Sequence, residues 1–172
     1  QENIGDVAIW LGQRAWLHRC GIEVINTGDP KGHHFNRLAK RLGAKDLILL
    51  RGGGNFGDLY PARQRFREAI LAAFPRQTII QLPQTLCFTQ ETSLQRARAA
   101  AAKHRRLIVF VRDHQSLEVA RNVLGVPSFL CPDMAFALGP LPRSAHPSLE
   151  VLWLWRKHAS PESWRRAPVR CP

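Results

Sequence analysis

The sequence predicts an α/β domain with a doubly wound, mostly parallel β-sheet, and two observations support this prediction. First, short apolar runs alternate with stretches of helical length along most of the 172 residues. Such alternation is typical of a parallel sheet whose strands are joined by helices. Second, the apolar runs are nearly continuous, which is typical of strands that are buried on both faces.

The apolar runs define six expected strands, and most of them end at a residue that disfavours a strand. They cover residues 22–25, 46–50, 78–82, 107–111, 126–130 and 151–155. Glycines follow the second run, and Pro83 follows the third. Because proline cannot donate a hydrogen bond to a neighbouring strand, we expect the third strand to end before Pro83.

Five helices are expected, one before the first of these strands and four between successive strands. They cover residues 6–19, 36–42, 61–74, 92–104 and 116–124. Pro61 stands at a favourable helix start, and Gly125 is a helix stop. The stretch 97–102 is rich in alanine, the strongest helix former.

The chain is expected to divide near residue 138. Residues 1–138 carry the strand–helix alternation and predict one Rossmann-like lobe. Residues 139–172 contain six prolines, which is typical of a linker. We interpret 139–172 as a linker, one strand and the truncated start of a second lobe.

The composition is that of a globular protein with an excess of positive charge. Hydrophobic residues make up 45% and charged residues 22%, which excludes a disordered or collagen-like chain. The 25 Lys and Arg against 13 Asp and Glu give a net charge of +12, which favours an anionic partner. The few aromatic residues do not alternate with arginines as base-stacking residues would, so no nucleic-acid partner is expected.

Two further absences in the sequence limit the function. The four cysteines form no CxxC pair, and the histidines show no ligand spacing, so no metal is expected. No apolar run reaches the ~20 residues that a membrane-spanning helix needs. We therefore expect a cytoplasmic protein that is at most peripheral at the inner face of the membrane.

The strongest local signal is the sequence RGGGNFGD at residues 51–58. Three adjacent glycines cost backbone entropy, and a tight turn needs only one or two of them. The pattern matches neither the GxGxxG dinucleotide motif nor the phosphate-binding P-loop. We predict that Gly52, Gly53, Gly54 and Asn55 bind substrate, and that Asp58 is a candidate catalytic residue; a purely structural turn is the alternative.

Polar residues also lie before the first helix and after three other expected strands. Asn3, Gly5 and Asp6 precede the helix, whereas Gln84, Arg112 and Asp133 follow strands. Carboxyl ends of parallel strands share one edge, where ligands of open α/β sheets bind. We therefore expect one cluster, although helix capping explains Asn3 or Asp6 about as well.

Five motifs follow one another in order along the chain. They are NIGD at 3–6, RGGGNFGD at 51–58, LPQT at 82–85, RDHQSL at 112–117 and PDMAF at 132–136. Together they resemble those of the polysaccharide pyruvyl transferases, over roughly residues 3–138 and then 151–156. The resemblance implies transfer of a pyruvyl group from phosphoenolpyruvate to a saccharide or lipid-linked saccharide, which forms a ketal without a cofactor.

The resemblance also implies a two-lobed architecture similar to B-type glycosyltransferases, with this chain as the N-terminal lobe. Catalytic acid–base residues are then expected in the second lobe, so this chain alone is expected to be inactive or nearly so. Within it, Asp6, Asp58 and Asp133 are the catalytic candidates. Two alternatives stay open: a lobe of a nucleotide-sugar glycosyltransferase, and a non-enzymatic module that binds anions or nucleic acid.

Overall fold

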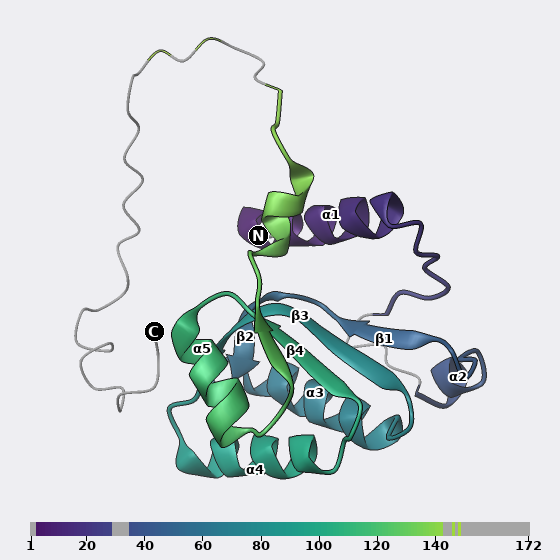
Figure 1. Ribbon diagram of the computed structural model, residues 1–172, viewed down its shortest axis with the longest axis vertical. Helices are drawn as coiled ribbons and strands as arrows, with labels where there is room; N and C mark the ends of the chain where they lie inside the picture. The colour runs from purple at the N-terminus through teal and green to yellow at the C-terminus, as the bar shows by residue number, and fades with distance from the viewer. Residues whose placement is uncertain (1–2, 29–34, 143–145, 147, 149–172) are drawn as a thin grey trace.

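The computed structural model of the protein describes residues 3–28, 35–142, 146 and 148. Two helices and then two strands come first, and helices and strands alternate along the rest of the chain (Figure 1). In order they are α1 (Ile4–Arg19), α2 (Phe35–Ala39), β1 (Leu47–Leu50), β2 (Gly53–Gly57), α3 (Pro61–Ala73), β3 (Thr78–Cys87), α4 (Glu91–Ala102), β4 (Leu107–Val111), α5 (His114–Glu118), the π-helical turn η2 (Val119–Val123), β5 (Ser128–Leu130) and the 3₁₀-helix η3 (Met134–Leu138).

The five strands form one parallel sheet around β3. On one side of β3, β1 pairs with its first half and β2 with its second half. On the other side lies β4, followed by β5. The parallel sheet that the buried apolar runs predicted is thus confirmed.

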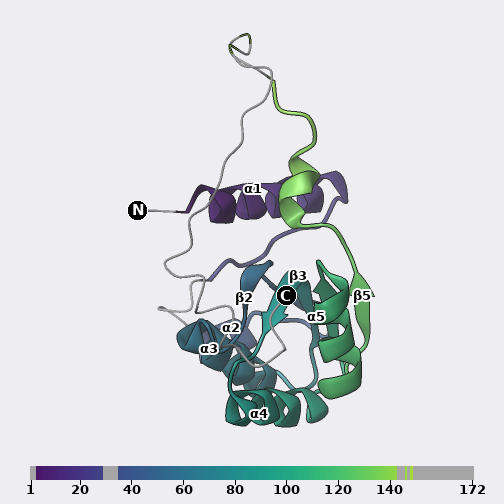
Figure 2. The same ribbon diagram turned by 90° about the vertical axis from the view of Figure 1, so that its left-hand side faces the viewer.

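Helices cover both faces of this sheet (Figures 1 and 2). Helices α3, α4 and α5 lie on one face over the larger core, which includes Ile79, Val109 and Ala120. Helix α1 and η3 lie together on the other face, over a smaller cluster of Ile9, Leu82 and Met134. The doubly wound α/β class is therefore confirmed.

The strand expected at residues 22–25 is not formed. This segment pairs with no described strand, and Ile22 and Val24 are 40% and 52% exposed. A strand depends on hydrogen bonds to a neighbour, and no described strand pairs with the outer edge of β1. The apolar pattern alone could not show that the pairing was missing. The strand expected at 151–155 lies outside the described residues, and so does most of 139–172.

The expectation that Pro83 ends the third strand is wrong. β3 continues from Thr78 to Cys87. The β3–β4 pairing shifts its register between Gln81 and Gln84, so Pro83 falls at an irregularity where its missing N–H costs no regular ladder bond. The longer β3 has a consequence for function: its second half pairs with the glycine-rich segment, which forms the strand β2.

The last expected strand and helix are also shorter or shifted. β5 holds only three residues, against the expected 126–130. The helix expected at 116–124 begins at His114 and turns into the π-helical η2 after Glu118. Asp113 caps its start by accepting a hydrogen bond from the Ser116 N–H at 2.7 Å.

Candidate functional site

The glycine-rich segment and Arg112 lie side by side at the carboxyl edge of the sheet. A Cβ built on Gly54 would stand 3.3 Å from Nη2 of Arg112. Gly54 belongs to β2, whereas Arg112 directly follows β4, on the far side of β3. The prediction that these strand ends share one edge is confirmed for this pair.

Arg112 is held by two neighbours rather than left free. Its Nη1 donates to Oδ2 of Asp133, and its Nη2 donates to Oγ1 of Thr85 at 2.7 Å. The side chains of Arg112 and Asp133 are 27% and 15% exposed, so the ion pair is mostly shielded from water. Asp133 also accepts from the Ala135 N–H at the start of η3. The edge therefore presents a guanidinium whose position is fixed and whose charge is partly compensated.

A second ion pair lies where α1 begins. Asn3 caps this helix by accepting a hydrogen bond from the Gly5 N–H at 3.0 Å. One turn on, Oδ1 of Asp6 lies 3.3 Å from Nη2 of Arg51, with side chains 53% and 42% exposed. Arg51 directly follows β1, so this pair places the first turn of α1 at the same edge of the sheet. Arg51 was not among the predicted site residues, although it opens the glycine motif.

Asp58 occupies a different environment from Asp6 and Asp133. Its carboxylate accepts hydrogen bonds from the Thr89 and Gln90 N–H groups and from the Thr89 hydroxyl. These contacts fix the turn that leads into α4. The catalytic role predicted for Asp58 therefore rests on the sequence alone.

Gln84 lies beneath the site rather than facing it. Its side chain is fully buried, and both ends of its amide are used. Oε1 accepts from the Asn55 N–H, while Nε2 donates to the Arg51 carbonyl and to Oδ1 of Asn55, each at 3.0 Å. Gln84 thereby ties β2 to the end of β1. Asn55 is half-buried between this amide and the site edge.

A buried arginine that the sequence analysis missed completes this support. Arg67 of α3 is 6% exposed and donates to the side-chain oxygens of Gln81, Gln64 and Asn55 at 2.8, 2.8 and 3.0 Å. Its guanidinium also lies 4.1 Å from the centre of the Phe56 ring. Burial lowers the pKa of Arg67 to about 9, and the charge of Glu68 opposes this shift. The signal in the sequence was a polar pair, Gln64 and Arg67, on the helix face that also carries Ile70 and Leu71.

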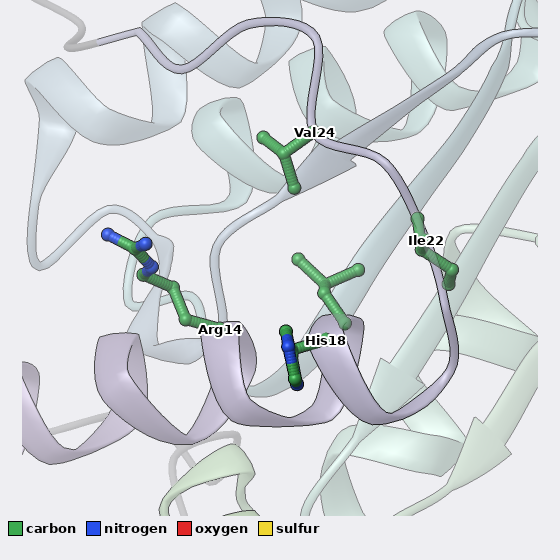
Figure 3. A pocket seen from close by; sticks show the side chains of 5 residues that line it. Arg14, His18, Ile22 and Val24 are labelled. Atoms are coloured by element: carbon green, nitrogen blue, oxygen red, sulfur yellow. The ribbon is translucent and has the colours of Figure 1, made fainter.

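A hollow of about 170 Å³ lies elsewhere on the molecule. It is lined by Arg14, Leu17, His18, Ile22 and Val24, from the second half of α1 and the segment that follows it (Figure 3). None of the predicted site residues lines it. Among the described residues, no group of three or more His, Cys, Asp or Glu side chains is arranged to hold a metal ion. Within the same part of the chain, every helix is too short or too polar to cross a bilayer.

Comparison with known proteins gives a consistent family match. Residues 3–169 match the family described as polysaccharide pyruvyl transferase. The chain is 34% identical over 176 residues to the putative pyruvyl transferase EpsO of Bacillus subtilis (strain 168), covering 95% of this chain and 54% of that protein. It is 32% identical over 147 residues to pyruvyl transferase 1 of Schizosaccharomyces pombe, covering 81% of this chain and 37% of that protein. The chain thus spans about half or less of the length of these curated relatives.

Proposed function

The chain belongs to the polysaccharide pyruvyl transferase family, and we propose that the protein containing it transfers a pyruvyl group from phosphoenolpyruvate to a saccharide, forming a ketal. The observation that supports this most is the arrangement at the carboxyl edge of the sheet. Two guanidinium groups, Arg51 and Arg112, flank a backbone without side chains at Gly53 and Gly54. The family match favours this activity over a nucleotide-sugar glycosyltransferase or a nucleic-acid-binding module.

The two arginines suit the charge of the donor. Phosphoenolpyruvate carries a phosphate and a carboxylate, and guanidinium groups bind both through paired N–H donors. Arg51 and Arg112 each contact a carboxylate, Asp6 and Asp133 respectively. An anionic donor would share or replace these partners. Because Arg51 is more exposed than Arg112, we expect Arg51 to reorient and Arg112 to stay in place.

The proposed reaction needs no oxidant or reductant. One sugar hydroxyl oxygen bonds to the central carbon of phosphoenolpyruvate while the methylene carbon gains a proton and becomes a methyl group. A second hydroxyl of the same sugar then bonds to that carbon, and the bond from carbon to the phosphate oxygen breaks. The sugar loses two hydroxyl protons. One is matched by the proton that the methyl group gains, and the other is taken up by the departing phosphate, which leaves as hydrogen phosphate.

Among the three carboxylates predicted to be catalytic, Asp6 is best placed to take a hydroxyl proton. Its side chain is 53% exposed, and Oδ1 lies 4.0 Å from the point where a Cβ on Gly53 would stand. Asp133 instead holds Arg112 and the start of η3 through its two oxygens. We assign Asp133 to positioning Arg112 and Asp6 to proton transfer.

A direct assay tests the proposed activity. The purified protein that contains this chain is incubated with phosphoenolpyruvate and saccharide acceptors. We expect stoichiometric phosphate release together with a ketal methyl signal in the proton NMR spectrum of the product. Consumption of a nucleotide sugar without phosphoenolpyruvate would instead favour the glycosyltransferase alternative.

A pair of arginine variants tests the binding of the donor. We expect Arg112→Gln to raise the KM for phosphoenolpyruvate by about 10- to 100-fold, as for a lost charge-assisted contact. Arg98→Gln is the matched control, because Arg98 is an exposed arginine on α4. Equal effects of the two changes would contradict a donor site at Arg112.

We also propose that the acceptor is lipid-linked or polymeric and that the protein works in the cytoplasm at an anionic membrane surface. The net charge of +12 supports this proposal, because basic surfaces are attracted to anionic lipids. The protein should sediment with phosphatidylglycerol vesicles but not with neutral phosphatidylcholine vesicles. High salt should release it. Binding to neither kind of vesicle would leave a soluble saccharide as the acceptor.

A further inference from the structure

Two polar atoms of opposite hydrogen-bonding character approach the same side of Gly53. Oδ1 of Asp6 and Nδ2 of Asn55 each lie 4.0 Å from the point where a Cβ on Gly53 would stand. The third neighbour of that point is Cδ1 of Ile9, at 3.8 Å. Asp6 offers an acceptor and Asn55 a donor. A single ligand hydroxyl, which both donates and accepts, complements this pair.

The orientation of the Asn55 amide is fixed by Arg67. Nη2 of Arg67 and Nε2 of Gln84 both donate to Oδ1 of Asn55, each at 3.0 Å. A guanidinium has no acceptor, so the atom of the Asn55 amide that faces Arg67 must be the oxygen. The amide nitrogen is therefore turned the other way, toward Gly53 and Asp6. Nδ2 has no hydrogen-bond partner among the described residues.

Arg67 is itself locked in place. Its Nε and Nη1 donate to Gln81 and Gln64, and its guanidinium packs over Phe56. Nε2 of Gln81 in turn donates to the carbonyls of Leu50 and Arg51, just before the glycine run. A buried cation is tolerated only when its donors are satisfied, so this network has one strongly preferred arrangement. Because Arg67 is held in this arrangement, its Nη2 keeps Oδ1 of Asn55 in one place and so fixes the orientation of the Asn55 amide.

We propose that Asp6 and Asn55 form a hydroxyl-binding subsite beside Gly53, and that Arg67 is the positioning residue that keeps Nδ2 of Asn55 turned toward it. The hydroxyl donates to Oδ1 of Asp6 and accepts from Nδ2 of Asn55. Naming this hydroxyl as one of the acceptor sugar rests on the proposed function. The subsite thereby gives Asp6 a defined substrate atom and separates acceptor binding from donor binding at Arg112. Arg51, whose Nη2 lies 3.3 Å from the same Oδ1 of Asp6, reorients toward the donor.

The variant Asn55→Asp tests the subsite with little change of shape. One carboxylate oxygen can still accept from Arg67 and Gln84, so the fold should keep its melting temperature or gain slightly. The outward donor becomes an acceptor beside Asp6, so the hydroxyl loses its donor. We expect the KM for the acceptor to rise by about tenfold or more while the KM for phosphoenolpyruvate stays within about twofold. The control is Asn36→Asp, an exposed position on α2 with the same charge change.

The variant Arg67→Lys tests the positioning role. A lysine ammonium cannot span three amide oxygens in the fixed fork of a guanidinium, so Asn55 loses its orientation. A purely structural role would lower the melting temperature and the amount of folded enzyme, with both KM values unchanged. The positioning role instead predicts a selective rise in the KM for the acceptor. If Arg67→Lys does not fold, Asn55→Asp alone decides the subsite.

Three outcomes would overturn the inference. An unchanged acceptor KM in Asn55→Asp removes the subsite, and a selective rise in the donor KM assigns Nδ2 to phosphoenolpyruvate instead. The third outcome comes from a binding measurement that needs no turnover, so failure of the subsite can be distinguished from failure of the proposed function. Methyl glucopyranoside serves as a minimal polyol probe. It should shift the side-chain amide NMR signal of Asn55 in the wild-type protein and leave the same signal unshifted in the Asp6→Asn variant. Equal shifts in both proteins would show that Asp6 takes no part.

Discussion

The glycines of one short segment fall into two groups that meet different surroundings. Gly52 and Gly57 face the backbone of β3: a Cβ would stand 2.7 Å from the Pro83 carbonyl oxygen at the first and 1.7 Å from that of Cys87 at the second. Gly53 and Gly54 face side chains at the site, with nearest atoms at 3.8 and 3.3 Å. A run that looks uniform in the sequence thus combines glycines needed for strand packing with glycines that border functional groups. Substitutions can separate the two groups.

The largest effect is expected at Gly57. A Cβ would overlap the Cys87 carbonyl, and the backbone φ of 135° disfavours any other residue. Gly57→Ala should therefore lower the free energy of unfolding by roughly 3 kcal/mol or more, through combined overlap and strain. Urea denaturation measures the loss. Soluble Gly57→Ala protein with wild-type stability would show that β2 does not pack on β3 as described.

Gly53 has a positive φ like Gly57, but a Cβ at Gly53 would not overlap another atom. Its φ is 134°, and a Cβ would meet no atom closer than 3.8 Å. We expect Gly53→Ala to cost about 1–3 kcal/mol of stability from strain. The methyl group would also occupy the point between Asp6 and Asn55, so activity per folded molecule should fall.

Gly125 supplies the matched control for this change. Its φ is 67°, and a Cβ there would meet no atom within 4 Å. Gly125→Ala should therefore show backbone strain with unchanged specific activity. If Gly53→Ala behaves in the same way, then Gly53 is needed only for its backbone conformation, and no subsite lies beside it.

The carboxylates of Asp58 and Asp6 differ in the same way as the two groups of glycines. Its contacts with Thr89 and Gln90 resemble those of a helix cap, whereas Asp6 is half exposed at the site. Asp58→Asn weakens the charge-assisted contacts with Thr89 and Gln90, so we expect a loss of about 1 kcal/mol in stability. The kcat of the folded protein should stay within about twofold. A fall of kcat by 100-fold or more without loss of stability would restore Asp58 as a catalytic residue.

The sequence predicts the strands that are covered on both faces, because a continuous apolar run such as that of β4 is favourable only in the interior of the domain. It also predicts that polar strand ends meet, because parallel strands end at one edge. Residues 22–25 show the limit of this argument. Their apolar residues suit a strand, but strand formation depends on a neighbour elsewhere in the chain.

Arg67 shows a second limit. Gln64 and Arg67 would ordinarily indicate a solvated helix face, because arginine is seldom buried. Only the positions of Gln81, Asn55 and Phe56 in three dimensions show that this face of α3 is packed on the sheet. Likewise, the sequence marks Asn55 and Gln84 as equivalent candidates. The structure separates the buried amide of Gln84 from the outward nitrogen of Asn55.

The smallest effect is expected at Gly54, and it is the sharpest test of the donor site. Gly54 is exposed and its φ is not positive, so the backbone accepts alanine without strain. A Cβ would stand 3.3 Å from Nη2 of Arg112, which is the end of a side chain and can shift by a few tenths of an ångström. Gly54→Ala should therefore cost less than about 0.5 kcal/mol in stability, as for an ordinary surface change. The displaced guanidinium should raise the KM for phosphoenolpyruvate by about two- to fivefold and leave the acceptor KM unchanged, the reverse of the pattern expected for Asn55→Asp. Identical steady-state kinetics for Gly54→Ala and wild type would show that the donor does not depend on the position of Arg112.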